Sequence, residues 1–89
     1  MSRIQAMGAN SLIRAYREKV SDIQSETLER SLKQLQAGRD PEVVMRHLAH
    51  TLGNKLMHTP TTRLREAAEV DDKALLAAAR TLLDLPDNK

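Results

Sequence analysis

The longest apolar pattern in the chain is a helical stripe whose members follow one another at intervals of three, four, three, five, four and three residues. They are Ile13, Tyr16, Val20, Ile23, Leu28, Leu32 and Leu35. Intervals of three and four place side chains on one face of an α-helix, and the interval of five is a phase slip near Thr27. A helix over residues 11–37 would be about 40 Å long. The rest of an 89-residue chain is too short to cover it, so we expect this stripe to form a homodimer interface.

The choice of apolar residues points to helices in the rest of the chain as well. Leu and Ala dominate, Tyr16 is the only aromatic residue, and Phe and Trp are absent. Leu and Ala favour helices, whereas sheets favour β-branched and aromatic residues, so a β-sandwich or barrel is excluded. The predicted fold is all-α: a small bundle of about four helices, with one long N-terminal helix, completed by homodimerisation.

Turn-forming residues predict where the helices begin and end. Gly38 suits the left-handed position after a helix, and Asp40 then reads as an N-cap followed by proline. Thr59 precedes a proline in the same way, and Asp71 or Asp72 can cap a last helix. The expected helices cover about 11–37, 41–58, 60–69 and 72–84.

A softer break at residues 8–11 suggests how the chain is divided. Gly8 is followed by Asn10 and Ser11, either of which can cap a helix. We therefore expect residues 1–10 to end a preceding helix, residues 11–85 to form the helical domain, and residues 86–89 to be a polar tail.

Several classes of site are excluded by what the sequence lacks. Without cysteine there is no disulfide, no thiolate zinc site and no thiol nucleophile. No phosphate-binding glycine motif or nucleophile elbow is present. No apolar run approaches the roughly 18 residues of a membrane span, and the net charge of +2 does not by itself indicate nucleic acid. The expectation is a soluble chain with no catalytic, cofactor or metal site of its own and no contact with membranes.

The titratable residues have ordinary explanations. Two histidines three residues apart, His47 and His50, are a weak metal signal when no carboxylate or cysteine accompanies them. His58 is expected in the last turn of a helix, where imidazole can bond terminal carbonyls. The carboxylates of one polar face are interpreted as solvated; they are Glu18, Asp22, Glu26 and Glu29.

Two further features near the second proline are worth following. Lys55, Arg63 and Arg65 form a modest basic cluster, for which surface ion pairing is a simpler role than phosphate binding. Gly53 lies inside an expected helix, where glycine costs about 1 kcal/mol relative to alanine. Close approach of another helix is our preferred explanation for it.

One segment resembles a known family. It comprises Asn54, Lys55, Leu56, Met57, His58, Thr59, Pro60 and Thr61, followed by Leu64, Arg65, Glu66, Ala67 and Ala68. This is similar to the N-K-L-L-H-x-P-T … L-R-x-A segment in the C-terminal dimerisation domain of bacterial glutamyl-tRNA reductase. Residues 13–17 and 28–35 resemble two further stretches of that domain, so the resemblance spans residues 11–85. Met57 in place of Leu and the preceding Gly53 are mild departures.

The resemblance implies a role within a larger protein. The family reduces the glutamyl group of glutamyl-tRNA with NADPH to glutamate-1-semialdehyde for tetrapyrrole (haem) synthesis in the cytoplasm. Its catalytic cysteine, its NADPH site and its binding of glutamyl-tRNA belong to other domains. By this resemblance the present chain is a structural homodimerisation domain. A free-standing helical adaptor or regulator and a small helical nucleic-acid binder are the alternatives.

Overall fold

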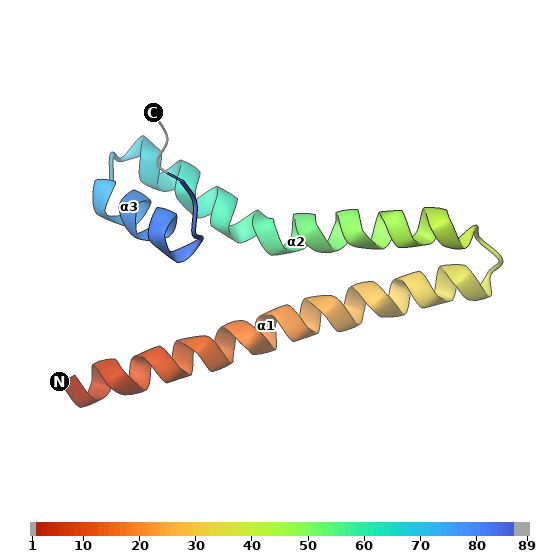
Figure 1. The fold of residues 1–89 in the computed structure, drawn as a ribbon, viewed down its shortest axis with the longest axis horizontal. Helices are drawn as coiled ribbons and strands as arrows, with labels where there is room; N and C mark the ends of the chain where they lie inside the picture. Colours follow the sequence, from red (N-terminus) through yellow and green to blue (C-terminus); the bar gives the residue numbers. More distant parts are fainter. Residues whose placement is uncertain (1, 87–89) are drawn as a thin grey trace. The chain divides into compact units, whose positions relative to one another are not determined.

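The computed structural model describes residues 2–86, and the side chains of residues 8–86. It contains three helices, α1 (Ser2–Gln36), α2 (Pro41–Glu69) and α3 (Lys73–Leu82), as Figure 1 shows. No strand occurs among the described residues. The predicted all-α class, with one long N-terminal helix, is confirmed. The chain divides into two compact units, Met1–Leu56 and Met57–Lys89, and each is described by itself.

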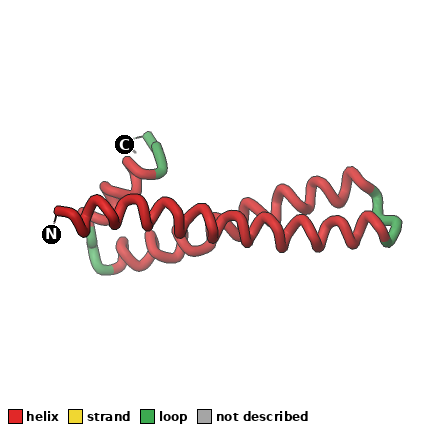
Figure 2. Tube along the Cα trace, turned by 90° about the horizontal axis from the view of Figure 1, so that it is seen from below, coloured by secondary structure: helices red, strands yellow, loops and turns green. Residues whose placement is uncertain are grey.

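The first unit is a helical hairpin. The last turns of α1 and the first turns of α2 run antiparallel and lie side by side in both views (Figures 1 and 2). Gly38 makes the turn with a φ of +91°, and the Arg39 amide donates to the Gln34 carbonyl at 3.1 Å. The Asp40 carboxylate then accepts from the Glu42 amide at 3.2 Å. The predicted roles of Gly38 and Asp40 are confirmed.

The contact between these two helices is small and partly polar. Its buried members are Thr27, Ser31 and Val44, which are 4%, 5% and 1% exposed. We call these three residues the hairpin seam. Ile23 and Leu48 flank it and are half-buried. The hairpin is therefore held together by few apolar side chains.

The second unit joins the end of α2 to α3. Asp71 adopts a positive φ of 56°, and the Asp72 amide donates to the Ala67 carbonyl at 2.8 Å. Asp72 then caps α3 by accepting from the Leu75 amide at 3.0 Å, as predicted for this pair of aspartates. Ala67 is the buried apolar residue of this unit, and α3 has no buried residue. This unit leaves its apolar side chains even less covered.

The break expected at Thr59-Pro60 is wrong, because α2 continues through Pro60. Proline removes one backbone hydrogen bond and costs about 3 kcal/mol inside a helix, but it does not end a helix whose packing continues on both sides. Here the proline is exposed, whereas Leu56 before it and Leu64 after it are half-buried. His58 consequently lies well inside α2, and the terminal role expected for it is wrong too.

The soft break at residues 8–11 does not interrupt the backbone either. α1 is one helix from Ser2 to Gln36, with Gly8 inside it. A single glycine lowers helix stability by about 1 kcal/mol, which a long helix tolerates. The division into residues 1–10, 11–85 and 86–89 stays a prediction.

Candidate dimerisation surface

The apolar stripe expected on α1 splits at its phase slip. Val20 and Ile23 are half-buried on the side that leads into the hairpin seam. An interval of five residues turns the next side chain by about 140° around the helix, since each residue turns by about 100°. Leu28 and Leu32 therefore point away from the seam and are 49% and 45% exposed. The face that α1 presents to α2 continues through small polar residues instead.

The remaining members of the stripe are uncovered as well. Ile13, Tyr16 and Leu35 are 55%, 64% and 37% exposed. The placement of all seven residues at a subunit interface stays a prediction. Five of them have the exposure in one protomer that such an interface needs.

α2 contributes apolar residues to the same side of the hairpin as the leucines of α1. In two antiparallel helices, the residue that follows a contact residue points to the same side in both. Leu28 follows Thr27, and Met45, which is 65% exposed, follows Val44. Ala49 and Leu52 extend the row from Met45 at intervals of four and three.

We call this surface the leucine face. Its members are Leu28, Leu32, Leu35, Met45, Ala49 and Leu52. Lys55 Nζ lies 3.8 Å from Glu26 Oε1, an ion pair that joins α2 to α1 within the hairpin.

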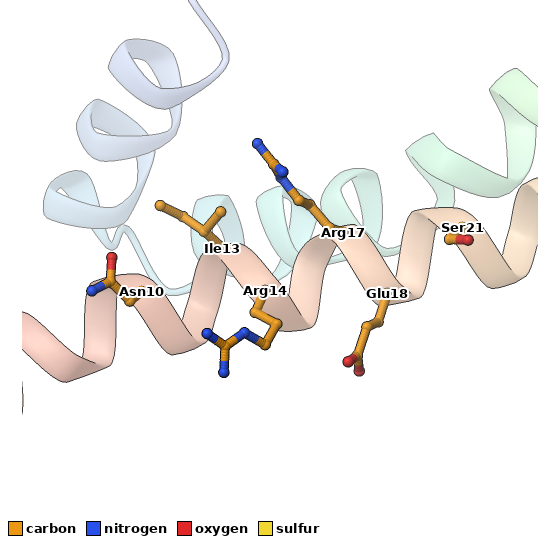
Figure 3. Close-up of a pocket in the computed structure, with 6 residues that line it drawn as sticks. All are labelled: Asn10, Ile13, Arg14, Arg17, Glu18 and Ser21. Carbon is orange, nitrogen blue, oxygen red and sulfur yellow. The ribbon is translucent and has the colours of Figure 1, made fainter.

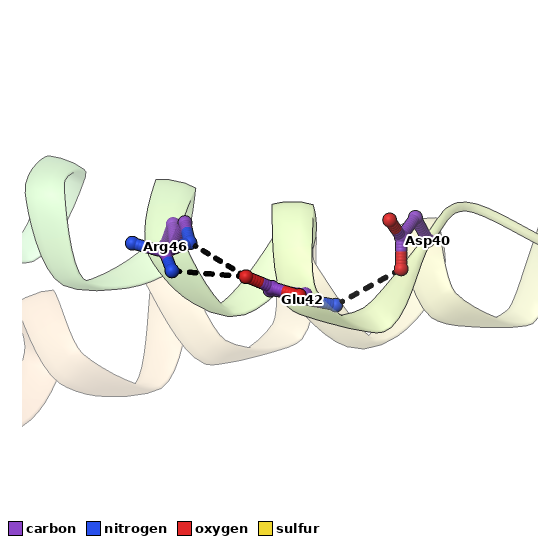
Figure 4. A network of polar contacts seen from close by, with 3 residues as sticks. All are labelled: Asp40, Glu42 and Arg46. Atoms are coloured by element: carbon purple, nitrogen blue, oxygen red, sulfur yellow. Dashed lines mark hydrogen bonds and ion pairs between the residues drawn. The ribbon is translucent and has the colours of Figure 1, made fainter.

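A charged group stands beside this face near the hairpin turn. Arg46 Nη2 and Nε contact the same carboxylate oxygen of Glu42 at 2.9 and 3.1 Å, as Figure 4 shows. Asp40 caps the same helix next to them. All three side chains are exposed, so this group marks a solvated edge of α2.

Towards the N-terminus, the same side of α1 becomes mostly polar and charged. A shallow depression there is lined by Asn10, Ile13, Arg14, Arg17, Glu18 and Ser21. Figure 3 shows Ile13 and Arg17 leaning to one edge of this strip, and Arg14 and Glu18 to the other. All the lining residues belong to one helix, and their side chains do not converge on a point. We call this region the polar strip.

The histidines contact neutral side chains on their own helix. His47 Nε2 lies 3.4 Å from Thr51 Oγ1, and His50 Nε2 lies 3.0 Å from Asn54 Nδ2. Among the described residues, no group of three or more His, Cys, Asp or Glu side chains could hold a metal ion. His58 is exposed on α2.

The basic cluster is largely engaged in ion pairs. Lys55 contacts Glu26, and Arg63 contacts Glu66 at 3.1 Å. Such pairs neutralise charge that a phosphate would need, which favours the surface role expected for this cluster. Of the carboxylates expected to be solvated, all four are exposed: Glu18, Asp22, Glu26 and Glu29.

The close approach of another helix expected at Gly53 is not found within the protomer. A Cβ built at this position meets no neighbouring atom of the chain within 4 Å. Gly53 therefore costs helix stability without a close approach inside the protomer. Gly8 and Gly53 lie inside helices and Gly38 makes the hairpin turn, so none of them forms a glycine-rich loop that could cradle a dinucleotide phosphate.

The segment that carries the family resemblance lies on α2 and spans both units. In the first unit, Asn54 is exposed, while Lys55 and Leu56 are half-buried. In the second unit, Thr61 and Arg65 are exposed and Leu64 is half-buried.

Sequence reasoning missed the contribution of α2 to the leucine face. It also placed all seven residues of the α1 stripe on one face, and it did not identify Thr27 and Ser31 as the buried residues of α1. The signal was present in the interval of five residues, because a slip of that size separates one stripe into two faces. No helix among the described residues is long and apolar enough to cross a membrane.

Comparison with known proteins gives matches that cover most of the chain. The family model for the glutamyl-tRNAGlu reductase dimerisation domain matches residues 1–85. A glutamyl-tRNA reductase of Coxiella burnetii (strain Dugway 5J108-111) is 42% identical over 85 residues, which are 96% of this chain and 21% of that protein.

Two further glutamyl-tRNA reductases give the same result. That of Chromohalobacter salexigens is 47% identical over 76 residues, covering 85% of this chain and 18% of its own length. The reductase of Hahella chejuensis is 35% identical over 89 residues, which are 100% of this chain and 21% of that protein. The chain thus spans about a fifth of the length of these relatives. No solved structure matches it.

Proposed function

The chain belongs to the family of glutamyl-tRNA reductase dimerisation domains, and from this membership we propose that it joins two copies of a longer reductase subunit. The domain acts as a structural element. It holds the subunits together through apolar helix faces that one copy leaves uncovered.

The observation that carries this proposal is the imbalance between buried and exposed apolar residues. Among the described residues, the buried hydrophobic side chains are Val44 and Ala67, whereas fourteen large hydrophobic side chains are exposed. Burying an apolar side chain stabilises a protein by about 1.5–3 kcal/mol, so two buried residues make a weak core. A two-fold partner would cover the exposed faces and supply the missing core.

The activity we propose for the parent protein is the reduction of glutamyl-tRNA, which its relatives' names describe. From the family resemblance we add NADPH as the reductant, glutamate-1-semialdehyde as the product for tetrapyrrole synthesis, and the cytoplasm as the location. Binding of glutamyl-tRNA and of NADPH is assigned to parts of the parent outside this chain. The residues described here do not fit a dinucleotide, because their glycines form no phosphate-binding loop.

Sedimentation equilibrium of the 89-residue chain tests the structural part of the proposal. We expect the mass of two chains at low micromolar concentration, with a dissociation constant that salt changes little because the contact is apolar. A folded monomer at high micromolar concentration would contradict the proposal and favour the adaptor. Tight RNA binding that falls steeply with salt would favour the nucleic-acid binder.

The enzymatic part needs the parent. The full-length protein should oxidise NADPH only when glutamyl-tRNA is present, and the isolated domain should not oxidise it at all. A catalytically active isolated domain would contradict the assignment of chemistry to other domains.

A further inference from the structure

We propose that the polar strip of α1 contacts the phosphate backbone of the glutamyl-tRNA on which the parent protein acts, with Arg14 and Arg17 as the two charged groups of the contact. This inference rests on the proposed function and deepens it, because it names a place where this chain meets the parent's substrate. The contact adds to the binding of glutamyl-tRNA by other parts of the parent and takes no part in the chemistry.

The positive charge of the chain is concentrated around this strip. Residues 10–21 hold three cationic side chains and one carboxylate, a net charge of +2, whereas residues 22–89 hold ten cationic side chains and eleven carboxylates. Nucleic acid is attracted by positive charge gathered on one face of a protein, which the net charge of a whole chain does not report. The small total charge is therefore compatible with a local contact to RNA.

The two arginines of the strip lack an anion from their own chain. Both are exposed, and among the described residues neither has an ion-pair or hydrogen-bond partner. Arg30 and Arg46 instead contact a glutamate four residues earlier, at 3.6 and 2.9 Å. Arg17 has no acidic residue three or four positions away in either direction. Because like charges three positions apart repel along a helix, an anion bound beside Arg14 and Arg17 would offset their repulsion.

The shape of the strip fits an extended anion rather than a small one. Its donors Asn10, Arg14, Arg17 and Ser21 follow one another at intervals of four, three and four, so they share one face over about 16 Å of helix. Figure 3 shows Arg14 and Arg17 at opposite edges of the strip, where each can reach a different phosphate. One strand of a double helix advances by roughly 3.4 Å per phosphate, so the strip can follow several of them.

The side-chain types also favour a nucleic-acid backbone. Arginine, asparagine and serine commonly bond phosphate and sugar oxygens, and such contacts position a protein without reading base sequence. An acidic protein surface could pair with the arginines too, but the parent's proposed substrate is itself a polyanion, which favours RNA. Glu18 lies at the same edge as Arg14 and repels phosphate there, so Arg17 should make the stronger of the two contacts.

Binding of glutamyl-tRNA by the full-length parent tests this inference. The variant Arg14→Gln/Arg17→Gln removes both charges and keeps hydrogen-bonding groups. We expect its dissociation constant for glutamyl-tRNA to rise about fivefold or more near physiological salt. The slope of log affinity against log salt should become shallower by about 2, since each lost phosphate contact reduces it by about 1. The rate of NADPH oxidation at saturating glutamyl-tRNA should not change.

Two matched variants serve as controls. Lys33→Gln/Arg39→Gln removes the same charge from exposed positions nearer the hairpin turn, and its affinity for glutamyl-tRNA should stay within about twofold of the wild type. Arg14→Lys/Arg17→Lys keeps both charges and should keep the salt slope. All three variants should retain the wild-type sedimentation and helix content, because the replaced side chains are exposed in the protomer.

The outcomes separate this inference from the proposed function. Unchanged RNA affinity in Arg14→Gln/Arg17→Gln would overturn the inference and point to an acidic protein surface as the ligand of the strip. An equal loss in Lys33→Gln/Arg39→Gln would overturn it in favour of a general charge effect, and loss of the dimer in the first variant would assign the strip to the subunit contact instead. A parent that binds RNA through these arginines but sediments as a monomer would overturn the proposed dimerisation alone.

Discussion

An ordinary small domain buries apolar side chains and exposes polar ones, whereas the hairpin seam buries polar residues and the leucine face exposes apolar ones. Thr27 and Ser31 are buried in the seam, whereas Leu28 and Leu32, one residue further along in each case, are about half exposed. Burying these two leucines in place of the polar pair would gain a single protomer several kcal/mol. The sequence therefore does not optimise the lone protomer, and it leaves leucines uncovered where the proposed dimer would bury them.

Small polar residues suit the seam for two reasons. They allow two helices to approach closely, and their hydroxyl groups can be satisfied without a partner helix. Thr27 Oγ1 donates to the Ile23 carbonyl of its own helix at 2.7 Å. Because the hydrogen bond stays within α1, burial leaves no unsatisfied group, and no buried side-chain nitrogen or oxygen lacks a partner among the described residues.

The largest expected effect is in the seam itself. Val44→Asp places a carboxylate at a position that is 1% exposed and has no basic partner in the seam, so the hairpin should lose several kcal/mol and unfold. Circular dichroism should show loss of helix at 25 °C. The matched control is Met45→Asp, one residue along on the leucine face, which should keep its helix content. A folded Val44→Asp chain would contradict the seam as described.

The next largest effect is on dimer formation, which distinguishes the leucine face from the hairpin seam. Leu28→Asp should abolish the dimer and leave the helices of the protomer formed, because Leu28 is exposed in one copy and an unpaired charge inside an interface costs several kcal/mol. Ile23→Asp should also reduce helix content, because Ile23 is half-buried beside the seam. Sedimentation velocity together with circular dichroism distinguishes the two results. If Leu28→Asp remained a dimer, the leucine face would not be the interface.

The seam and the leucine face also show which features of the fold can be predicted from the sequence. The all-α class, the turn at Gly38 and the cap at Asp40 depend on local rules, since backbone conformation and capping involve only neighbouring residues. The interval of five residues marks the division of the α1 stripe into two faces, but which of these faces meets α2 depends on how the hairpin closes, and spacing alone does not contain that. Pro60 misled for a similar reason, because packing on both sides of a proline can outweigh its local cost.

The residues of the leucine face could likewise be predicted only in part from the sequence. Leu28, Leu32 and Leu35 were found from their spacing on one helix. Met45 and Ala49 join the leucine face only because the hairpin turn sets α2 level with α1. A surface built from two helices depends on how they pair in the hairpin, which periodicity along one helix does not contain.

A smaller effect is expected at Gly53. Gly53→Ala should stabilise the chain by about 1 kcal/mol, because alanine favours a helix and its Cβ meets no atom of the protomer within 4 Å. Thermal unfolding of the dimer-deficient Leu28→Asp background measures this gain without interference from association. Should the same change weaken the wild-type dimer more than tenfold, Gly53 would belong to the contact with the second copy, and the interface would extend beyond the leucine face.

A still smaller change tests whether the seam needs its polar atoms. Thr27→Val keeps the shape of the side chain and removes the hydroxyl, while the Ile23 carbonyl retains its helical backbone partner. We expect stabilisation of less than about 1 kcal/mol, since an apolar methyl replaces a buried hydroxyl whose bond was local. Urea unfolding should show a higher midpoint with an unchanged slope. A loss greater than about 1 kcal/mol would mean that the hydroxyl of Thr27 makes a contribution beyond its own helix.

The smallest expected effect concerns the ion pair that joins the two helices of the hairpin. Lys55→Met removes the charge that contacts Glu26 and keeps the length of the side chain. Because these side chains are 35% and 59% exposed, solvent weakens the attraction, and we expect a loss of about 0.5 kcal/mol or less. The difference between the two chains should vanish at about 1 M salt, where charges are screened within about 3 Å. A loss that persists at high salt would mean that Lys55 stabilises the hairpin by packing of its stem beside the seam rather than by its charge.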